Sequence, residues 1–181
     1  DFNNFGLIQD LSHIPLIYDT PYSAIKTVGK YLTHAHIGNC VLKNKNKVLP
    51  IEKNNTKMIA VIGELATKGN IGDLGSSRVY PPYIRTPLEG IKNLAGNEVE
   101  ILYQDGSNPK ETLDLVKKAD YVIIVVGYTE KEEGEYVFTK GGDRDSLRLK
   151  KEDEELISML ASNNENCIVI MEGGSSIITE K

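Results

Sequence analysis

The sequence predicts an α/β protein, a three-layer α/β/α sandwich built on a flavodoxin-like, mostly parallel sheet. Short apolar runs rich in β-branched residues recur along the chain, as in strands that are buried on both faces of a parallel sheet. Segments with helix start and stop signals fall between these runs, so strand and helix alternate from residue 57 onward. Right-handed crossovers between parallel strands then place helices on both faces of the sheet.

Four segments carry the strand pattern. Residues 58–63 and 121–127 show it most cleanly, and both end in glycine. Residues 167–171 form a similar run that is followed by a pair of glycines, and residues 99–103 show the pattern less cleanly because a glutamate interrupts it. These segments are expected to be the four strands of the sheet.

Helix signals occupy the intervals between the strands. Residues 86–96 begin Thr-Pro-Leu-Glu, with a cap residue, a proline in the first turn and a glutamate three residues past the cap. Residues 108–119 begin with a similar Asn-Pro-Lys-Glu. Residues 151–162 begin with acidic side chains, which suit the positive end of a helix dipole. Apolar residues spaced by three and four also suggest a helix over residues 23–37.

The chain is expected to have two parts. Residues 1–56 contain several prolines and an Asn/Lys-rich stretch, and we interpret them as a linker or N-terminal extension that packs on a neighbour. Residues 57–181 form the α/β domain. Its sheet is expected to be incomplete on the C-terminal side, because the chain ends soon after the fourth strand. An open sheet edge and unburied apolar surface would favour self-association into a homo-oligomer.

Composition argues against several classes of protein. The net charge is −5, so a nucleic-acid partner, which needs a basic face, is not expected. The longest apolar run is too short to span a membrane and no secretory signal is recognisable, which favours a cytoplasmic location. Cys40 and Cys167 are expected to be free thiols. The three histidines lack partners at ligand spacing, so no metal site is predicted.

Ligands of parallel sheets bind beyond the carboxyl ends of the strands. The long loop after the first strand, residues 64–83, has neither a dinucleotide glycine fingerprint nor a phosphate loop. Its glycines either make simple tight turns or accompany hydrogen-bond donors to a polyol. The candidate donors are Ser76, Ser77 and Arg78.

The loop after the third strand, residues 128–149, carries a run of glutamates between residues 130 and 135. Such a run is either a solvated loop or the mount for a carboxylate that donates a proton. Asp143 and Arg144 offer an ion pair or a small network that would anchor this loop. Tyr136 either provides an aromatic surface for a ligand or packs in the core or at the rim.

Several strings in the chain resemble the C-terminal α/β domain of glycoside hydrolase family 3, which includes β-glucosidases. They are Gly-Ser-Ser-Arg-Val-Tyr-Pro-Pro-Tyr at 75–83, Thr-Pro-Leu-Glu-Gly-Ile at 86–91 and Gly-Gly-Asp-Arg-Asp-Ser-Leu at 141–147. The segment 41–50 is similar to the family's entry into this domain. The resemblance covers roughly residues 38–178.

The resemblance implies a part of a retaining β-glycosidase, which hydrolyses the O-glycosidic bond of a β-linked saccharide or glycoside without a cofactor. In that family an N-terminal (β/α)8 barrel carries the nucleophilic aspartate. This chain has no room for such a barrel, so it is expected to be inactive alone. Its own contribution is the acid/base glutamate, which matches Glu135, with Glu133 as the runner-up.

The alternative is a non-catalytic carbohydrate-binding or interaction module with the same flavodoxin-like fold. A nucleotide-binding regulatory domain is disfavoured because phosphate-loop residues are missing from the sequence.

Overall fold

The computed structural model describes residues 48–49, 51–71, 79–133 and 144–178, together with the backbone of three short N-terminal strands. The chain divides into two compact units, Asp1–Cys40 and Val41–Lys181. In the first unit, β1 (Leu7–Asp10) pairs in parallel with β2 (Leu32–His36).

The helix expected over residues 23–37 is therefore wrong at its C-terminal end. Residues 32–36 are extended, because hydrogen bonding to β1 satisfies their backbone groups in place of a helical ladder. The rest of that segment lies outside the described residues. The assignment of residues 1–56 as a linker stays a prediction.

The second unit is built on a sheet with the strand order β3-β7-β6-β4-β5. The pairs β4–β5, β4–β6 and β6–β7 are all parallel, so the predicted parallel sheet is confirmed. The strands are β3 (Cys40–Val41), β4 (Met58–Ile62), β5 (Glu100–Gln104), β6 (Tyr121–Gly127) and β7 (Cys167–Glu172).

The helices predicted at residues 86–96, 108–119 and 151–162 are confirmed, and the predicted cap residues fix the starts of the first two. The Thr86 hydroxyl accepts the N–H of Glu89 at 3.2 Å, and the Glu89 carboxylate accepts the N–H of Thr86 at 2.9 Å. Asn108 caps the next helix by accepting an N–H at 3.3 Å. The helices are α2 (Pro87–Ala95), α3 (Pro109–Val116), α4 (Glu130–Glu133) and α5 (Lys151–Ala161), with short 3₁₀ turns η4 (Lys53–Asn55) and η5 (Glu64–Thr67).

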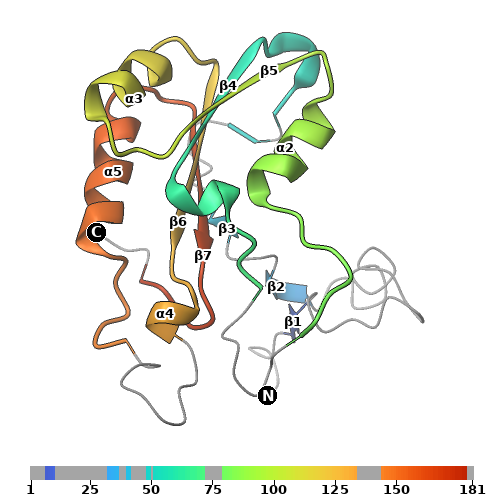
Figure 1. Cartoon of the computed structure of the whole chain (residues 1–181), viewed down its shortest axis with the longest axis vertical. Coiled ribbons are helices and arrows are strands. Elements are labelled where there is room, and N and C mark those ends of the chain that lie inside the picture. Colours follow the sequence, from blue (N-terminus) through green and yellow to red (C-terminus); the bar gives the residue numbers. More distant parts are fainter. Residues whose placement is uncertain are drawn as a thin grey trace, which may run out of the picture. The chain divides into compact units, whose positions relative to one another are not determined.

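Alternate residues of the central strands face opposite helix layers, which gives the predicted three-layer sandwich (Figure 1). Ile59 and Val61 of β4 pack in the core on the α2 side. Ala60 and Ile62 point the other way, into the core beneath α3 and α5. All four are at most 5% exposed, and burying a large aliphatic side chain contributes about 1.5–3 kcal/mol. Both faces of the sheet are therefore apolar, and polar chemistry is confined to its ends.

Two glycines shape the carboxyl edge of the sheet. Gly63 follows β4 with φ 120°, and a Cβ there would lie 2.0 Å from the Val125 carbonyl oxygen. Gly127 ends β6 with φ 132°, and its Cβ would lie 1.9 Å from the Glu172 carbonyl oxygen. Both positions require glycine. They allow the chain to turn out of two neighbouring strands into η5 and toward α4.

Among the described residues, no helix has the length and apolar character that crossing a membrane requires.

Candidate functional site at the carboxyl edge of the sheet

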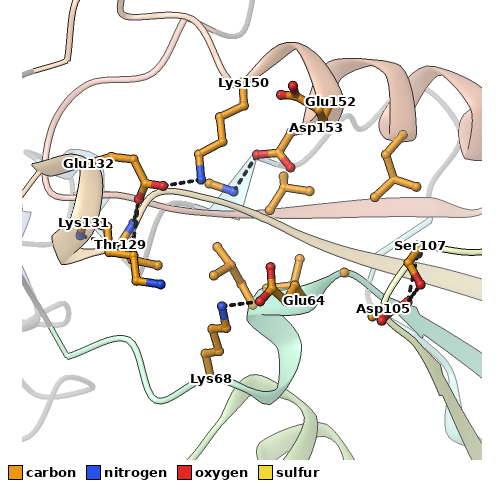
Figure 2. A pocket seen from close by; sticks show the side chains of 17 residues that line it. Glu64, Lys68, Asp105, Ser107, Thr129, Lys131, Glu132, Lys150, Glu152 and Asp153 are labelled. Carbon is orange, nitrogen blue, oxygen red and sulfur yellow. Dashed lines mark hydrogen bonds and ion pairs between the residues drawn. The ribbon is translucent and has the colours of Figure 1, made fainter.

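A cavity of about 420 Å³, lined by both polar and apolar residues, lies at the carboxyl ends of β4, β5 and β6 (Figure 2). β4 has β5 on one side and β6 on the other. The chain therefore runs from β4 to β5 on one side, and then crosses to β6 on the other side of β4. In open α/β sheets, this reversal point is where ligands bind. The walls come from the residues after each strand and from the first turn of α5.

Glu132 and Lys150 face one another across one side of this cavity (Figure 2). The Lys150 amine lies 2.7 Å from the Glu132 carboxylate, which also accepts the N–H and the hydroxyl of Thr129, each at 2.9 Å. Burial raises the pKa of Glu132, but the hydrogen bonds from Lys150 and Thr129 outweigh it and bring the pKa to about 2. Glu132 is therefore ionised at neutral pH and unsuited to donating a proton.

Asp153 lies beside this pair, in the first turn of α5. Its carboxylate accepts the N–H of Gly127 at 3.2 Å. Burial raises the pKa of Asp153, and the hydrogen bond from Gly127 opposes that rise. On the opposite wall, Glu64 pairs with Lys68. These cavity carboxylates have partners within the chain, so the cavity suits an uncharged polar ligand better than a strongly charged one.

A second feature joins the two ends of the glutamate-rich loop. Glu133 ends α4, and Arg144 is the first described residue after 134–143. The Arg144 Nε lies 2.7 Å from the Glu133 Oε1, and the two side chains are only 6% and 10% exposed. The residues that flank positions 134–143 thus form an ion pair with little exposed side-chain surface.

The segment after β7 supports this ion pair. Ser175 donates its hydroxyl to Glu133 Oε1 at 2.9 Å, and the Gly174 N–H donates to Oε2. Arg144 Nη2 donates to the Ser176 carbonyl at 2.8 Å and to the Ser175 hydroxyl. We call Glu133, Arg144 and residues 174–176 the loop clasp.

Tyr128 lies beside the loop clasp. The Arg144 guanidinium lies over its ring, 4.2 Å from the centroid, and the ring is nearly buried. The Tyr128 hydroxyl donates to the Arg148 carbonyl at 2.5 Å, which joins the two sides of the loop a second time. Arg144 Nη1 is buried and has no hydrogen-bond partner within the described part of the chain.

A polar pair that the sequence did not single out lies close to Tyr128. Asn70 donates from Nδ2 to the Glu172 carboxylate at 3.0 Å and to the Tyr128 carbonyl at 2.8 Å. Burial raises the pKa of Glu172, and the Asn70 hydrogen bond opposes that rise. The available signal was a glutamate that ends an apolar strand immediately before two glycines.

The structure describes two of the predicted site residues, Glu133 and Arg144, and brings them into contact. Within the described ranges, no group of three or more His, Cys, Asp or Glu side chains could hold a metal ion. The other predicted site residues lie outside those ranges, so their roles stay predictions: Ser76, Ser77, Arg78, Glu135, Tyr136 and Asp143.

The fold and the site define a class: an α/β sandwich domain with acidic side chains at the carboxyl edge of a parallel sheet. The family description "Glycosyl hydrolase family 3 C-terminal domain" matches residues 40–181. The chain belongs to this family, as its motifs predicted.

Several named proteins are similar to the chain. It is 33% identical over 147 residues to a beta-xylosidase of Formosa agariphila, covering 74% of this chain and 20% of that protein. It is 29% identical over 147 residues to the thermostable beta-glucosidase B of Acetivibrio thermocellus, covering 76% of this chain and 18% of the relative.

Solved structures show the same fold. A GH3 beta-glucosidase of Bifidobacterium adolescentis matches with a TM-score of 0.61 and 28% identity, covering 76% of this chain and 20% of the other. The chain therefore spans about a fifth of the length of the relatives that it matches.

Proposed function

We propose that this chain is the acid/base domain of a retaining β-glycosidase, and that its full-length polypeptide also contains an N-terminal (β/α)8 barrel with the nucleophilic aspartate. Family membership and the glycosidase names of the relatives support this proposal. The share of those relatives that the chain covers, about a fifth, supports the presence of a further domain. The single observation that carries the proposal is the match to the Glycosyl hydrolase family 3 C-terminal domain over residues 40–181. The Glu133–Arg144 ion pair, which flanks the glutamate-rich segment after β6, is consistent with it.

In the proposed mechanism, Glu135 protonates the glycosidic oxygen while the aspartate of the barrel attacks the anomeric carbon. The bond to the leaving group breaks, and a covalent glycosyl-enzyme forms. Glu135 then takes a proton from water, whose oxygen attacks the anomeric carbon; the bond to the aspartate breaks, which frees the carboxylate and releases the sugar. No cofactor takes part in this mechanism.

The contacts of Glu133 favour Glu135 over its runner-up. Both oxygens of the Glu133 carboxylate already accept hydrogen bonds, and its side chain is only 10% exposed. Donating a proton to a substrate would take Glu133 away from Arg144 and leave a buried charge without its partner. Glu135 lies two residues further along the chain, so the Cα atoms of Glu133 and Glu135 are at most about 7 Å apart.

The remaining predicted residues complete the proposed site. Ser76, Ser77 and Arg78 would donate hydrogen bonds to sugar hydroxyls, and Tyr136 would stack on the ring. Asp143 would help Arg144 to anchor the loop. The chain is also 29% identical over 151 residues to an exo-alpha-(1->6)-L-arabinopyranosidase of Bifidobacterium longum. The names of this relative and of the two above suggest the sugars to test: β-glucosides, β-xylosides and α-L-arabinopyranosides.

The first test compares the 181-residue chain with its full-length polypeptide on para-nitrophenyl glycosides of these three sugars. We expect turnover by the full-length protein alone, because the chain by itself lacks the nucleophile. Hydrolysis by the isolated chain would mean that it holds a complete active site, and the proposal would be wrong.

The second test replaces the acid/base residue. Glu135→Gln in the full-length protein should lower kcat/KM on an alkyl or other poor leaving group by about 10²–10⁴-fold. With an activated leaving group such as dinitrophenolate, kcat/KM should fall much less, because the departing oxygen needs no proton. An unchanged rate on the poor substrate would remove Glu135 from this role.

One observation favours a second candidate, a non-catalytic carbohydrate-binding module. The cavity at the carboxyl ends of β4, β5 and β6 is formed by this chain alone and requires no second domain. Saturable binding of glucose or xylose to the isolated chain by calorimetry, with no turnover by the full-length protein, would support the module instead of the enzyme.

A further inference from the structure

We propose that the Glu133–Arg144 ion pair is a positioning device that sets the orientation of the acid/base carboxylate toward the leaving group. The inference rests on the proposed role of Glu135. It assigns a function to two side chains that do not themselves react.

The side chains of the Glu133–Arg144 pair are much less exposed than those of a second arginine–glutamate pair, Arg148–Glu154. The Glu133 and Arg144 side chains are 10% and 6% exposed, whereas Arg148 and Glu154 form a 2.8 Å ion pair with side chains 52% and 36% exposed. Removing a carboxylate and a guanidinium from water costs about as much as their attraction returns. Stability alone is therefore a weak reason for burying this pair at the base of the loop.

The contacts of the pair fix its geometry in several directions. The guanidinium binds through Nε and Nη2 and also lies over the Tyr128 ring. The Glu133 carboxylate binds Arg144, the Ser175 hydroxyl and a backbone N–H, using both oxygens. A planar fork can make this set of contacts, and the single ammonium of a lysine cannot.

The pair is close to the proposed acid/base residue along the chain. Residue 135 follows Glu133 by two positions, and the other end of the same loop is held by Arg144. A small displacement of the loop base would therefore move the carboxylate relative to the glycosidic oxygen. A misplacement of about 1 Å in a catalytic geometry can cost 10²-fold in rate.

The contacts of the loop clasp do not use every hydrogen-bond donor of the Arg144 guanidinium. Its Nη1 is buried and has no hydrogen-bond partner among the residues that the structure describes. A buried guanidinium nitrogen is costly to leave unpaired. Among the described residues, this donor is thus the part of the guanidinium that the ion pair leaves unfilled.

The test uses the full-length protein with Glu133→Gln or Arg144→Lys, and Glu154→Gln as the matched control in the exposed pair. Each variant is assayed on aryl glycosides of one sugar with leaving groups of graded acidity. We expect kcat/KM on the poorest leaving groups to fall by about 10- to 100-fold in the two clasp variants. On the most activated leaving group it should change less than threefold, which makes the dependence on leaving-group acidity steeper. The Glu154→Gln control should match the parent on every substrate.

A uniform loss of kcat/KM on every leaving group would show a structural role only and would overturn the proposal. Thermal melting identifies variants that fail to fold. For that case Ser175→Ala is the milder substitute, because it removes one hydroxyl donor to Glu133 and leaves both charges paired. It should steepen the leaving-group dependence by a few-fold, and an unchanged dependence would contradict the proposal.

A parallel assay separates failure of this inference from failure of the proposed function. Azide can attack the glycosyl-enzyme where the base carboxylate has been removed, breaking the bond to the aspartate and giving a β-glycosyl azide. Glu135→Ala should form this product, and Glu133→Gln should not, because its base is still present. Azide product from Glu133→Gln would make Glu133 the base and overturn its positioning role. A Glu135 variant that behaves like the parent would instead refute the proposed function.

Discussion

Asp120 links the starts of β6 and β4: its carboxylate accepts the N–H of Met58 at 2.9 Å. It also accepts the N–H of the neighbouring Lys57, at 2.7 Å. Asp120 stands immediately before β6, and Met58 is the first residue of β4, so the aspartate fixes how the two central strands begin side by side. The hydrogen bonds from Met58 and Lys57 lower the pKa of Asp120.

The first prediction concerns Asp120→Ala. A carboxyl whose pKa is lowered by folding adds stability above its unfolded pKa of about 3.9, and this stability is lost as the pH falls through the folded pKa. Because Asp120 is only partly buried and solvent weakens its hydrogen bonds, we expect a loss of only about 1 kcal/mol at pH 7. Urea unfolding at pH 7 and pH 3 should show the difference shrinking at the lower pH. Asp114→Ala, at an exposed position of α3, serves as the control and should lose no stability.

The second prediction compares two glycines. Gly63→Ala should destabilise the chain by about 2–3 kcal/mol or more, because alanine there meets both an unfavourable φ and the Val125 carbonyl oxygen at 2.0 Å. Gly90→Ala is the matched control: it lies inside α2, and a Cβ there meets nothing within 4 Å. Alanine should stabilise that helix by about 0.5–1 kcal/mol. Thermal melting of the two variants should therefore move in opposite directions, and a shift in the same direction would contradict the assigned geometry.

Local signals in the sequence predicted the elements, because the interactions that set them are local. Thr86 and Glu89 are three residues apart, and their capping box depends on little else. The glycine after each central strand was equally visible. The segment 32–36 was misjudged because its state is decided by pairing with β1, which lies far away in the sequence.

The site was predictable only in part, for the same physical reason. The glutamate-rich loop and Arg144 could be identified from the sequence, but the pairing of Arg144 with Glu133 could not be deduced. That contact depends on residues 174–176, which reach the loop only when β7 pairs with β6. Asn70 and Glu172 are likewise joined by the folded sheet, across most of the domain sequence.

The third prediction concerns Asp153→Asn. Burial raises the pKa of Asp153 above its ordinary value, so its contribution to stability is complete below the unfolded pKa of about 3.9 and is lost as the pH rises through the folded pKa. An asparagine oxygen can still accept the Gly127 N–H, and it carries no charge to bury. The variant should therefore be at least as stable as the parent at pH 7. Urea unfolding should show that the difference in unfolding free energy between variant and parent disappears near pH 3. A difference that favours the variant more at pH 3 than at pH 7 would contradict this account.

The fourth prediction is a pH-dependent coupling between Asn70 and Glu172. Their hydrogen bond, at 3.0 Å, is strongest when the carboxylate is ionised, because an ionised acceptor binds a donor more tightly. A double-mutant cycle of Asn70→Ala and Glu172→Gln should give a coupling energy of about 0.5–1.5 kcal/mol at pH 8. Burial raises the pKa of Glu172, so the coupling should weaken as the pH falls through that raised value, above the unfolded pKa of about 4.3. Asn70 also donates a hydrogen bond to the Tyr128 carbonyl. Asn70→Ala removes this bond whether or not Glu172 has been replaced, so its contribution to stability cancels in the cycle.

Unfolding free energies of the four proteins at pH 8 and pH 4 provide the measurement. A coupling that is the same at both pH values would mean that the charge on Glu172 has no part in the contact.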